Sequence, residues 1–113
     1  MTQPAGTIPT ISVADASARL EPADPDGPML VDVREPDEWR TVRANGATPI
    51  PMSQFQDRHA ELPKDRPLFV ICATGSRSAA ATAFLLRSGW TDVANVDGGT
   101  VAWERAGFPV NRG

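Results

Sequence analysis

Two kinds of hydrophobic pattern alternate along the chain. Continuous apolar runs of strand length occupy residues 29–33 and 68–71. Residues 78–87, which follow the second run, have the composition of a helix that Gly89 ends. Shorter strands are expected at 10–13, 47–52 and 90–96, and further helices at 15–20, 35–39, 54–62 (capped by Ser53) and 100–106. This alternation predicts a three-layer α/β/α fold with a central, mainly parallel sheet of about five short strands.

The domain organisation follows from the positions of proline and glycine. Residues 1–9 contain two prolines and a glycine and are expected to form a flexible tail. Residues 10–113 are long enough for a single domain with a modest core. No apolar run reaches the length of a membrane span, and the first residues lack the basic and apolar regions of a signal peptide.

Charge and cysteine content narrow the classes of partner. The net charge is −3, and residues 1–28 carry all of this excess. The rest of the chain is neutral overall, so no basic face for nucleic acid is expected. The single cysteine cannot form an internal disulfide and suits a reducing compartment, which predicts a cytoplasmic protein. We expect a monomer or weak dimer without a metal or cofactor.

Cys72 is the candidate for chemistry. It stands between the apolar run 68–71 and the helical segment 78–87, so a short loop joins strand to helix around it. Backbone N–H groups of such a loop and the helix dipole favour an anion, and a thiolate placed there has a depressed pKa. A lone cysteine at the end of a buried strand is more often a small core residue. The loop nevertheless favours a nucleophile, because Gly75 permits a tight turn, Arg77 offers a planar set of donors, and Ser76 and Ser78 can cap the helix or donate hydroxyls.

Asp32 and Arg34 lie at the carboxyl end of the other long apolar run. An unpaired carboxylate inside that run would be expensive, so Asp32 is expected to accept hydrogen bonds or pair with an arginine. A structural role for Asp32 is favoured over direct chemistry. Arg34 and Cys72 both follow strands, so they could share one ligand-binding edge of a parallel sheet. His59 stands among polar residues and is expected to be solvated and without a catalytic role.

Four segments together resemble the single-domain rhodaneses, a family of sulfurtransferases. They follow one another in the order and spacing of that family and span nearly the whole domain. The segments are 31–39 (VDVREPDEW), Gly46-Ala47 followed by Ile50-Pro51, 70–78 (VICATGSRS), and 97–103 (DGGTVAW) continued by 106–109 (AGFP).

The resemblance implies a function. It makes Cys72 the catalytic cysteine, which would take a sulfane sulfur from a donor such as thiosulfate as a persulfide and pass it to cyanide or a thiol. The substrate-binding loop would consist of Ala73, Thr74, Gly75, Ser76, Arg77 and Ser78. The expected partners are a small anionic sulfur donor and a thiol or protein acceptor.

Two alternatives and one departure accompany this resemblance. A sulfur-relay or regulatory interaction module with little thiosulfate activity is possible on the same fold. A phosphatase or arsenate reductase needs a wider loop, whereas only four residues separate Cys72 from Arg77. Residues 42–45 (VRAN) replace the Gly-His-Ile segment of many relatives, so we expect a different loop shape there and a different surface for acceptor docking. Arg77 either binds the substrate or pairs with an acid and stabilises the loop.

Overall fold

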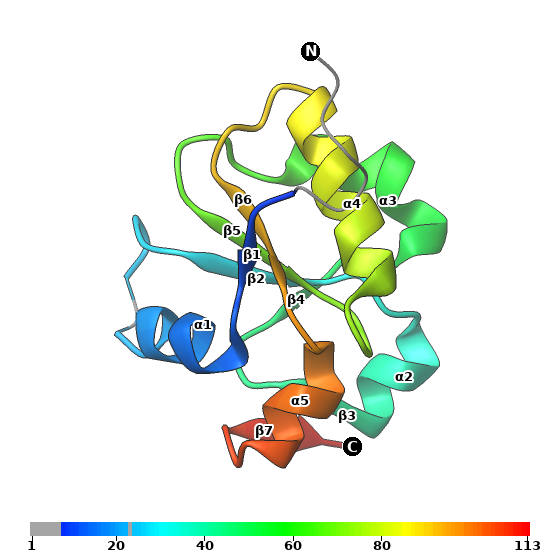
Figure 1. Cartoon of the computed structure of the whole chain (residues 1–113). Coiled ribbons are helices and arrows are strands. Elements are labelled where there is room, and N and C mark those ends of the chain that lie inside the picture. The colour runs from blue at the N-terminus through cyan, green and yellow to red at the C-terminus, as the bar shows by residue number, and fades with distance from the viewer. Residues whose placement is uncertain (1–7, 23) are drawn as a thin grey trace.

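The computed structural model describes residues 8–22 and 24–113, so residues 1–7 of the expected tail lie outside the described part. Five parallel strands form the central sheet in the order β1-β6-β5-β2-β4 (Figure 1). They are β1 (Thr10–Ile11), β2 (Met29–Asp32), β4 (Thr48–Pro49), β5 (Leu68–Ile71) and β6 (Val93–Val96). The predicted α/β architecture with about five parallel strands is confirmed.

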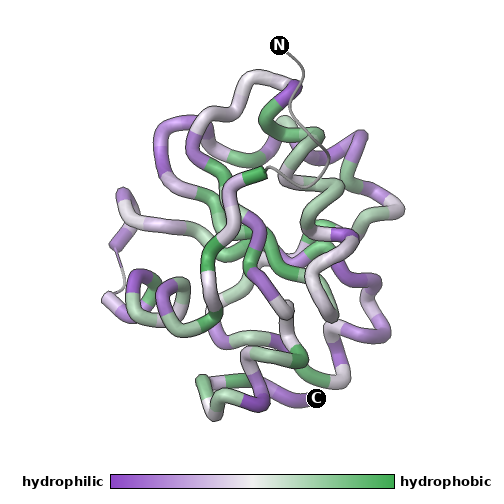
Figure 2. Tube along the Cα trace, viewed as in Figure 1, coloured by the Kyte–Doolittle hydropathy of each residue, from purple (hydrophilic) through white to green (hydrophobic). Residues whose placement is uncertain are grey.

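Helices cover both faces of the sheet, and the two faces have separate cores. Helices α3 (Met52–Arg58) and α4 (Ser76–Arg87) cover one face, and α1 (Val13–Leu20) and α5 (Gly99–Arg105) cover the other (Figure 1). Side chains of a strand alternate between faces, so β5 sends Leu68 and Val70 to the first core and Phe69 and Ile71 to the second. Because both faces are buried, the strands are continuously apolar. Figure 2 accordingly shows hydrophobic segments along the central strands.

A two-stranded antiparallel ribbon lies outside the main sheet and was not predicted. It pairs β3 (Val42–Ala44) with β7 (Val110–Arg112). A three-residue strand carries too little pattern to be recognised without its distant partner. The ribbon includes most of the segment that departs from the family pattern. Asn45 follows it and accepts a hydrogen bond from the side chain of Asn111 at 2.8 Å.

Helix α2 (Pro36–Thr41) follows β2 and begins as predicted, with proline in its first turn. Helix α3 begins two residues before the expected Gln54 and ends at Arg58, where a 3₁₀ turn (His59–Glu61) continues the chain. The predicted cap by Ser53 is wrong. Ser53 lies inside the helix, and its hydroxyl donates to Glu35 at 2.7 Å.

His59 is less solvated than its polar neighbours predicted. Its ring is half-buried and lies 4.8 Å from the ring of Phe84 and 5.5 Å from that of Trp90, measured between centroids. These contacts place His59 in an aromatic cluster at the end of α3.

Within residues 8–22 and 24–113, the structure contains no helix with the length and apolar character needed to span a membrane.

Candidate active site

The structure places Cys72 directly after β5, the middle strand of the sheet. Its side chain belongs to the core under α3 and α4 and has no exposed surface. Carboxyl ends of parallel strands are the usual ligand-binding edge of an open α/β sheet. Cys72 therefore lies where a ligand-binding site is expected, although its side chain is as buried as that of a core residue.

The turn after Cys72 brings hydrogen-bond donors to its sulfur. Gly75 adopts φ +111°, which other residues rarely adopt, and is the N-cap residue of α4. This turn lets the amide of Gly75 donate to Cys72 Sγ at 3.0 Å. The hydroxyl of Ser78, one turn into α4, lies 3.2 Å from the same sulfur. Of the other predicted loop residues, Thr74 and Ser76 are exposed.

These contacts change the acidity of the thiol. Burial is the largest single influence and raises the pKa of Cys72, because it disfavours the charged form. Hydrogen bonds from the hydroxyl of Ser78 and from the amides of Ser78, Gly75 and Thr74 act in the opposite direction and together outweigh burial. The net result is a pKa of Cys72 below its ordinary value, which favours a nucleophilic thiolate.

We therefore expect the ultraviolet absorbance of the Cys72 thiolate to titrate with a midpoint below that of a free thiol, about 8.5. The chain suits this measurement, because it contains one cysteine and no tyrosine whose ionisation would overlap. Ser78→Ala removes a donor and should raise the midpoint. A wild-type midpoint at or above the free-thiol value would contradict the expected activation.

Helix α5 holds the other side of the loop. The amide and hydroxyl of Thr100 donate to the carbonyl oxygen of Cys72 at 2.8 and 3.1 Å, and the amide of Val101 donates to that of Ala73 at 3.1 Å. The first turn of α5 therefore fixes both carbonyl groups. Gly99 makes this approach possible, since a Cβ atom there would lie 2.5 Å from both carbonyl oxygens.

We expect Gly99→Ala to destabilise the fold by about 1–3 kcal/mol, because a methyl group forced against two backbone carbonyls overpacks the contact. The alkylation rate of Cys72 should change as well, since the displaced loop carries the thiol. Thermal unfolding and alkylation should be compared with those of Gly107→Ala, a control at which φ is also positive but no atom lies within 4 Å. Equal stability of the two variants would contradict the steric argument.

Arg77 is paired with Glu38 of α2. Its two terminal nitrogens donate to the two carboxylate oxygens at 2.7 and 2.9 Å, and both side chains are about one-third exposed. The Glu38 carboxylate also accepts from the amide of Glu35, so it connects the loop to the start of α2. The hydrogen bonds from Arg77 are the largest influence on the carboxyl and lower the pKa of Glu38 to about 2. Of the two roles predicted for Arg77, pairing with an acid is the one that its contacts show.

This pair predicts a pH dependence of stability. The pKa of Glu38 falls from about 4.5 to about 2 on folding, so its stabilisation is fully present above about pH 4.5 and is lost as the pH falls toward 2. The pair is partly exposed, so its contribution should be at most about 1 kcal/mol. The difference in unfolding free energy between wild type and Glu38→Gln should be largest near neutral pH and shrink in acid. Glu61→Gln, at an exposed pair with Arg58, is the matched control for charge removal.

Asp32 and Arg34 form a buried ion pair at the end of β2. The guanidinium donates to both carboxylate oxygens, with its shortest contact 2.9 Å, and the backbone amide of Arg34 adds another at 2.9 Å. Arg34 also donates to the carbonyl oxygens of Val42, at 2.6 Å, and Glu38, at 3.4 Å. These contacts join β2 to α2 and β3, and they match the structural role expected for Asp32. The described contacts of Arg34 do not include the Cys72 loop.

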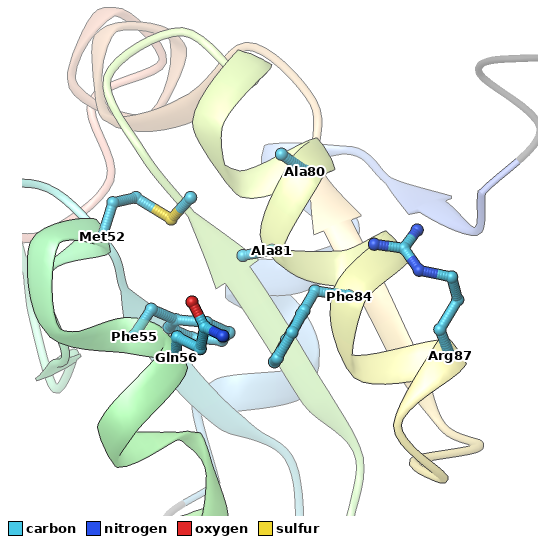
Figure 3. Close-up of a pocket in the computed structure, with 7 residues that line it drawn as sticks. All are labelled: Met52, Phe55, Gln56, Ala80, Ala81, Phe84 and Arg87. Carbon is cyan, nitrogen blue, oxygen red and sulfur yellow. The ribbon is translucent and has the colours of Figure 1, made fainter.

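A cavity of about 270 Å³ opens between α3 and α4 (Figure 3). Its lining consists of Met52, Phe55 and Gln56 of α3 and Ala80, Ala81, Phe84 and Arg87 of α4. Phe55 and Ala81 share the core that contains Cys72, but Cys72 does not line the cavity. The cavity therefore borders the core that contains Cys72, but the sulfur does not form part of its wall.

Sequence reasoning found Cys72, Gly75 and Ser78, which the structure brings together. It missed Glu38, Gly99 and Thr100, and also Asn95, whose side chain is hydrogen-bonded to Gly75 and Ser78. Glu38 and the residues 99–100 lay in segments that resembled the family, yet nothing local linked them to the loop. Asn95 was the exception, because asparagine is uncommon in strands and its place inside a predicted strand could have indicated a special role. All four act through contacts with residues distant in sequence.

Helices cover both faces of a parallel sheet, and a hydrogen-bonded thiol lies between the middle strand of that sheet and the helix that follows it. These features define an α/β protein with a candidate cysteine nucleophile. Residues 12–106 match the model of the rhodanese-like domain. A sulfurtransferase from Allochromatium vinosum is 39% identical over 88 residues, which cover 78% of this chain and 82% of that protein. Thiosulfate sulfurtransferase GlpE from Vibrio cholerae is 38% identical over 84 residues, covering 72% and 76% of the respective chains.

The structural similarity agrees with these matches. The crystal structure of a rhodanese-related protein from Thermoplasma volcanium superposes with a TM-score of 0.82 at 33% identity, covering 91% of this chain and 97% of the other. The chain therefore belongs to the rhodanese-like sulfurtransferase family.

Proposed function

We propose that the protein moves a sulfane sulfur from an anionic donor such as thiosulfate to a thiol or cyanide through a persulfide on Cys72. The observation that carries this proposal is the set of donors around one sulfur, with Gly75 N at 3.0 Å and Ser78 Oγ at 3.2 Å. Donors in this arrangement stabilise a thiolate, the form of cysteine that attacks. The similarity to a thiosulfate sulfurtransferase supports thiosulfate as the donor.

The reaction proceeds in two displacements. The Cys72 thiolate attacks the sulfane sulfur of thiosulfate, a new S–S bond forms, and the old S–S bond breaks with its electron pair leaving on sulfite. The negative charge then resides on the outer sulfur of the persulfide. An acceptor nucleophile attacks that outer sulfur, and the Cys72 thiolate is released for another cycle.

The acceptor must come from outside the chain. Cys72 is the only cysteine in the sequence, so no second thiol can resolve the persulfide as an internal disulfide. A thiol of a small molecule or of a partner protein would then complete the cycle, and cyanide would replace it in an assay.

Mass spectrometry of the intact protein after treatment with thiosulfate tests this proposal. Wild type should gain the mass of one sulfur atom at Cys72 and lose it when cyanide or a thiol is added. Cys72→Ala should gain nothing under the same conditions. Absence of the added sulfur on wild type, with sulfite also absent from the solution, would overturn the function.

A phosphatase activity is the alternative that the same samples can exclude. The four residues between Cys72 and Arg77 make a short loop, and Arg77 is already paired with Glu38. A phosphoryl group brings three oxygens that need donors, whereas a transferred sulfur is a single atom. Wild type should therefore leave aryl phosphates uncleaved. Efficient cleavage would make the protein a phosphatase of this fold.

A further inference from the structure

Asn95 is a buried amide inside β6, which lies between β1 and β5 in the sheet, and such residues are uncommon in strands. Its side chain is 7% exposed and makes two hydrogen bonds to the Cys72 site. The Nδ2 group donates to the carbonyl oxygen of Gly75 at 3.2 Å, and Oδ1 accepts from the hydroxyl of Ser78 at 2.5 Å. Asn95 therefore contacts both residues that hold the sulfur of Cys72, without contacting the sulfur through a hydrogen bond of its own.

The hydroxyl of Ser78 has one hydrogen for two acceptors. Asn95 Oδ1 lies 2.5 Å from Ser78 Oγ, and Cys72 Sγ lies 3.2 Å from it. The carbonyl of Gly75 can only accept, so the nitrogen of the amide must face it and the oxygen must face Ser78. Two oxygens that lie 2.5 Å apart need a hydrogen between them. The hydroxyl of Ser78 therefore makes a shorter and stronger hydrogen bond to Asn95 Oδ1 than to Cys72 Sγ.

The direction of this hydroxyl depends on the charge of the sulfur. When Ser78 donates to Asn95, it turns a lone pair toward Cys72, which suits a neutral sulfur. A thiolate instead attracts the hydrogen and leaves the oxygen of Asn95 facing Ser78 without it. The two acceptors thus compete for one hydrogen.

We propose that Asn95 is a positioning residue that draws the Ser78 hydroxyl hydrogen away from Cys72 and so favours the neutral form of the inner sulfur. The consequence for turnover rests on the proposed function. Formation of the persulfide moves the negative charge from Cys72 Sγ to the outer sulfur, and the hydroxyl can then return to Asn95. Asn95 would therefore favour the sulfur-loaded state over the resting thiolate.

Other charges around Cys72 stay constant in the test. They are Arg77 of α4 with its partner Glu38 of α2, the buried pair of Asp32 and Arg34 after β2, and the exposed Asp97 after β6. Their described side-chain contacts include neither Ser78 nor Asn95. A substitution at Asn95 therefore changes the hydrogen-bond competition and leaves the charged groups in place.

Titration of the Cys72 thiolate by its ultraviolet absorbance tests the proposal. Asn95→Val removes the competing acceptor and suits a strand, so the midpoint should fall by about half to one pKa unit, the size of one hydrogen bond. Ser78→Ala should raise the midpoint. Adding Asn95→Val to Ser78→Ala should change nothing further, because the effect of Asn95 passes through the missing hydroxyl.

Asn95→Ala removes the same acceptor and serves as a second variant if the valine variant does not fold. A midpoint that falls only when Ser78 is present supports the proposal. A midpoint that stays or rises without Asn95, or that falls equally in the Ser78→Ala background, overturns it. The titration uses neither a sulfur donor nor a sulfur acceptor, so its result is independent of the test of sulfur transfer by mass spectrometry.

Discussion

Under the proposed function, Cys72→Ser should reduce sulfur transfer on the order of 10⁴-fold or more, the scale on which removal of a nucleophile acts in covalent enzymes. The hydroxyl that replaces the thiol is a much weaker nucleophile and forms no persulfide. The thiosulfate:cyanide reaction should be measured at several donor concentrations, so that loss of turnover is distinguished from weaker binding.

The same variant should remain folded. Serine is close to cysteine in size, and it can still accept from the amide of Gly75, which donates to the sulfur in wild type. Thermal unfolding should therefore show a single transition near that of wild type. Retained activity in a folded serine variant would show that Cys72 is a core residue and that another group carries the reaction.

Arg34→Met should lower the unfolding free energy by about 3–5 kcal/mol, the cost of leaving one member of a buried ion pair without its partner. Asp32 has no exposed surface and Arg34 is 4% exposed, so water cannot replace the lost contacts. The carbonyl oxygens of Val42 and Glu38 would lose a donor as well. Denaturant unfolding monitored by tryptophan fluorescence measures the change.

The matched control is Arg58→Met, which breaks the pair of Arg58 with Glu61. Those side chains are 38% and 58% exposed, and exposed pairs contribute at most about 1 kcal/mol. The double variant of Asp32→Leu and Arg34→Met should lose less stability than the two single variants added together, because no unpaired charge remains. Equal effects of Arg34→Met and Arg58→Met would show that burial does not determine the cost.

The sequence predicted those features that are encoded locally. Cys72, Gly75 and Ser78 lie within seven residues, so strand, turn and helix signals sufficed to place them around one loop. The alternation of apolar strands and helices likewise predicted the layers. The partners of the loop escaped prediction, because each depends on a pairing between distant segments.

Arg77 illustrates this limit. Its charge indicated an anion nearby, and both a substrate and an acidic side chain satisfied that condition. The acid, Glu38, lies 39 residues earlier in the chain, in the first turn of α2, where a carboxylate is favoured by the helix dipole without any distant partner. Similarly, the antiparallel ribbon joins segments more than sixty residues apart, each too short to carry a pattern.

The fixing of the Cys72 loop by α5 has a consequence for biosynthesis. Asn95, Thr100 and Val101 all follow Cys72 in the chain, so a ribosome releases the cysteine before the residues that complete its surroundings. Domains generally fold as units once their last elements emerge. The partly made chain therefore carries a thiol without this set of contacts, and the full environment of Cys72 is assembled only after β6 and α5 have emerged and packed.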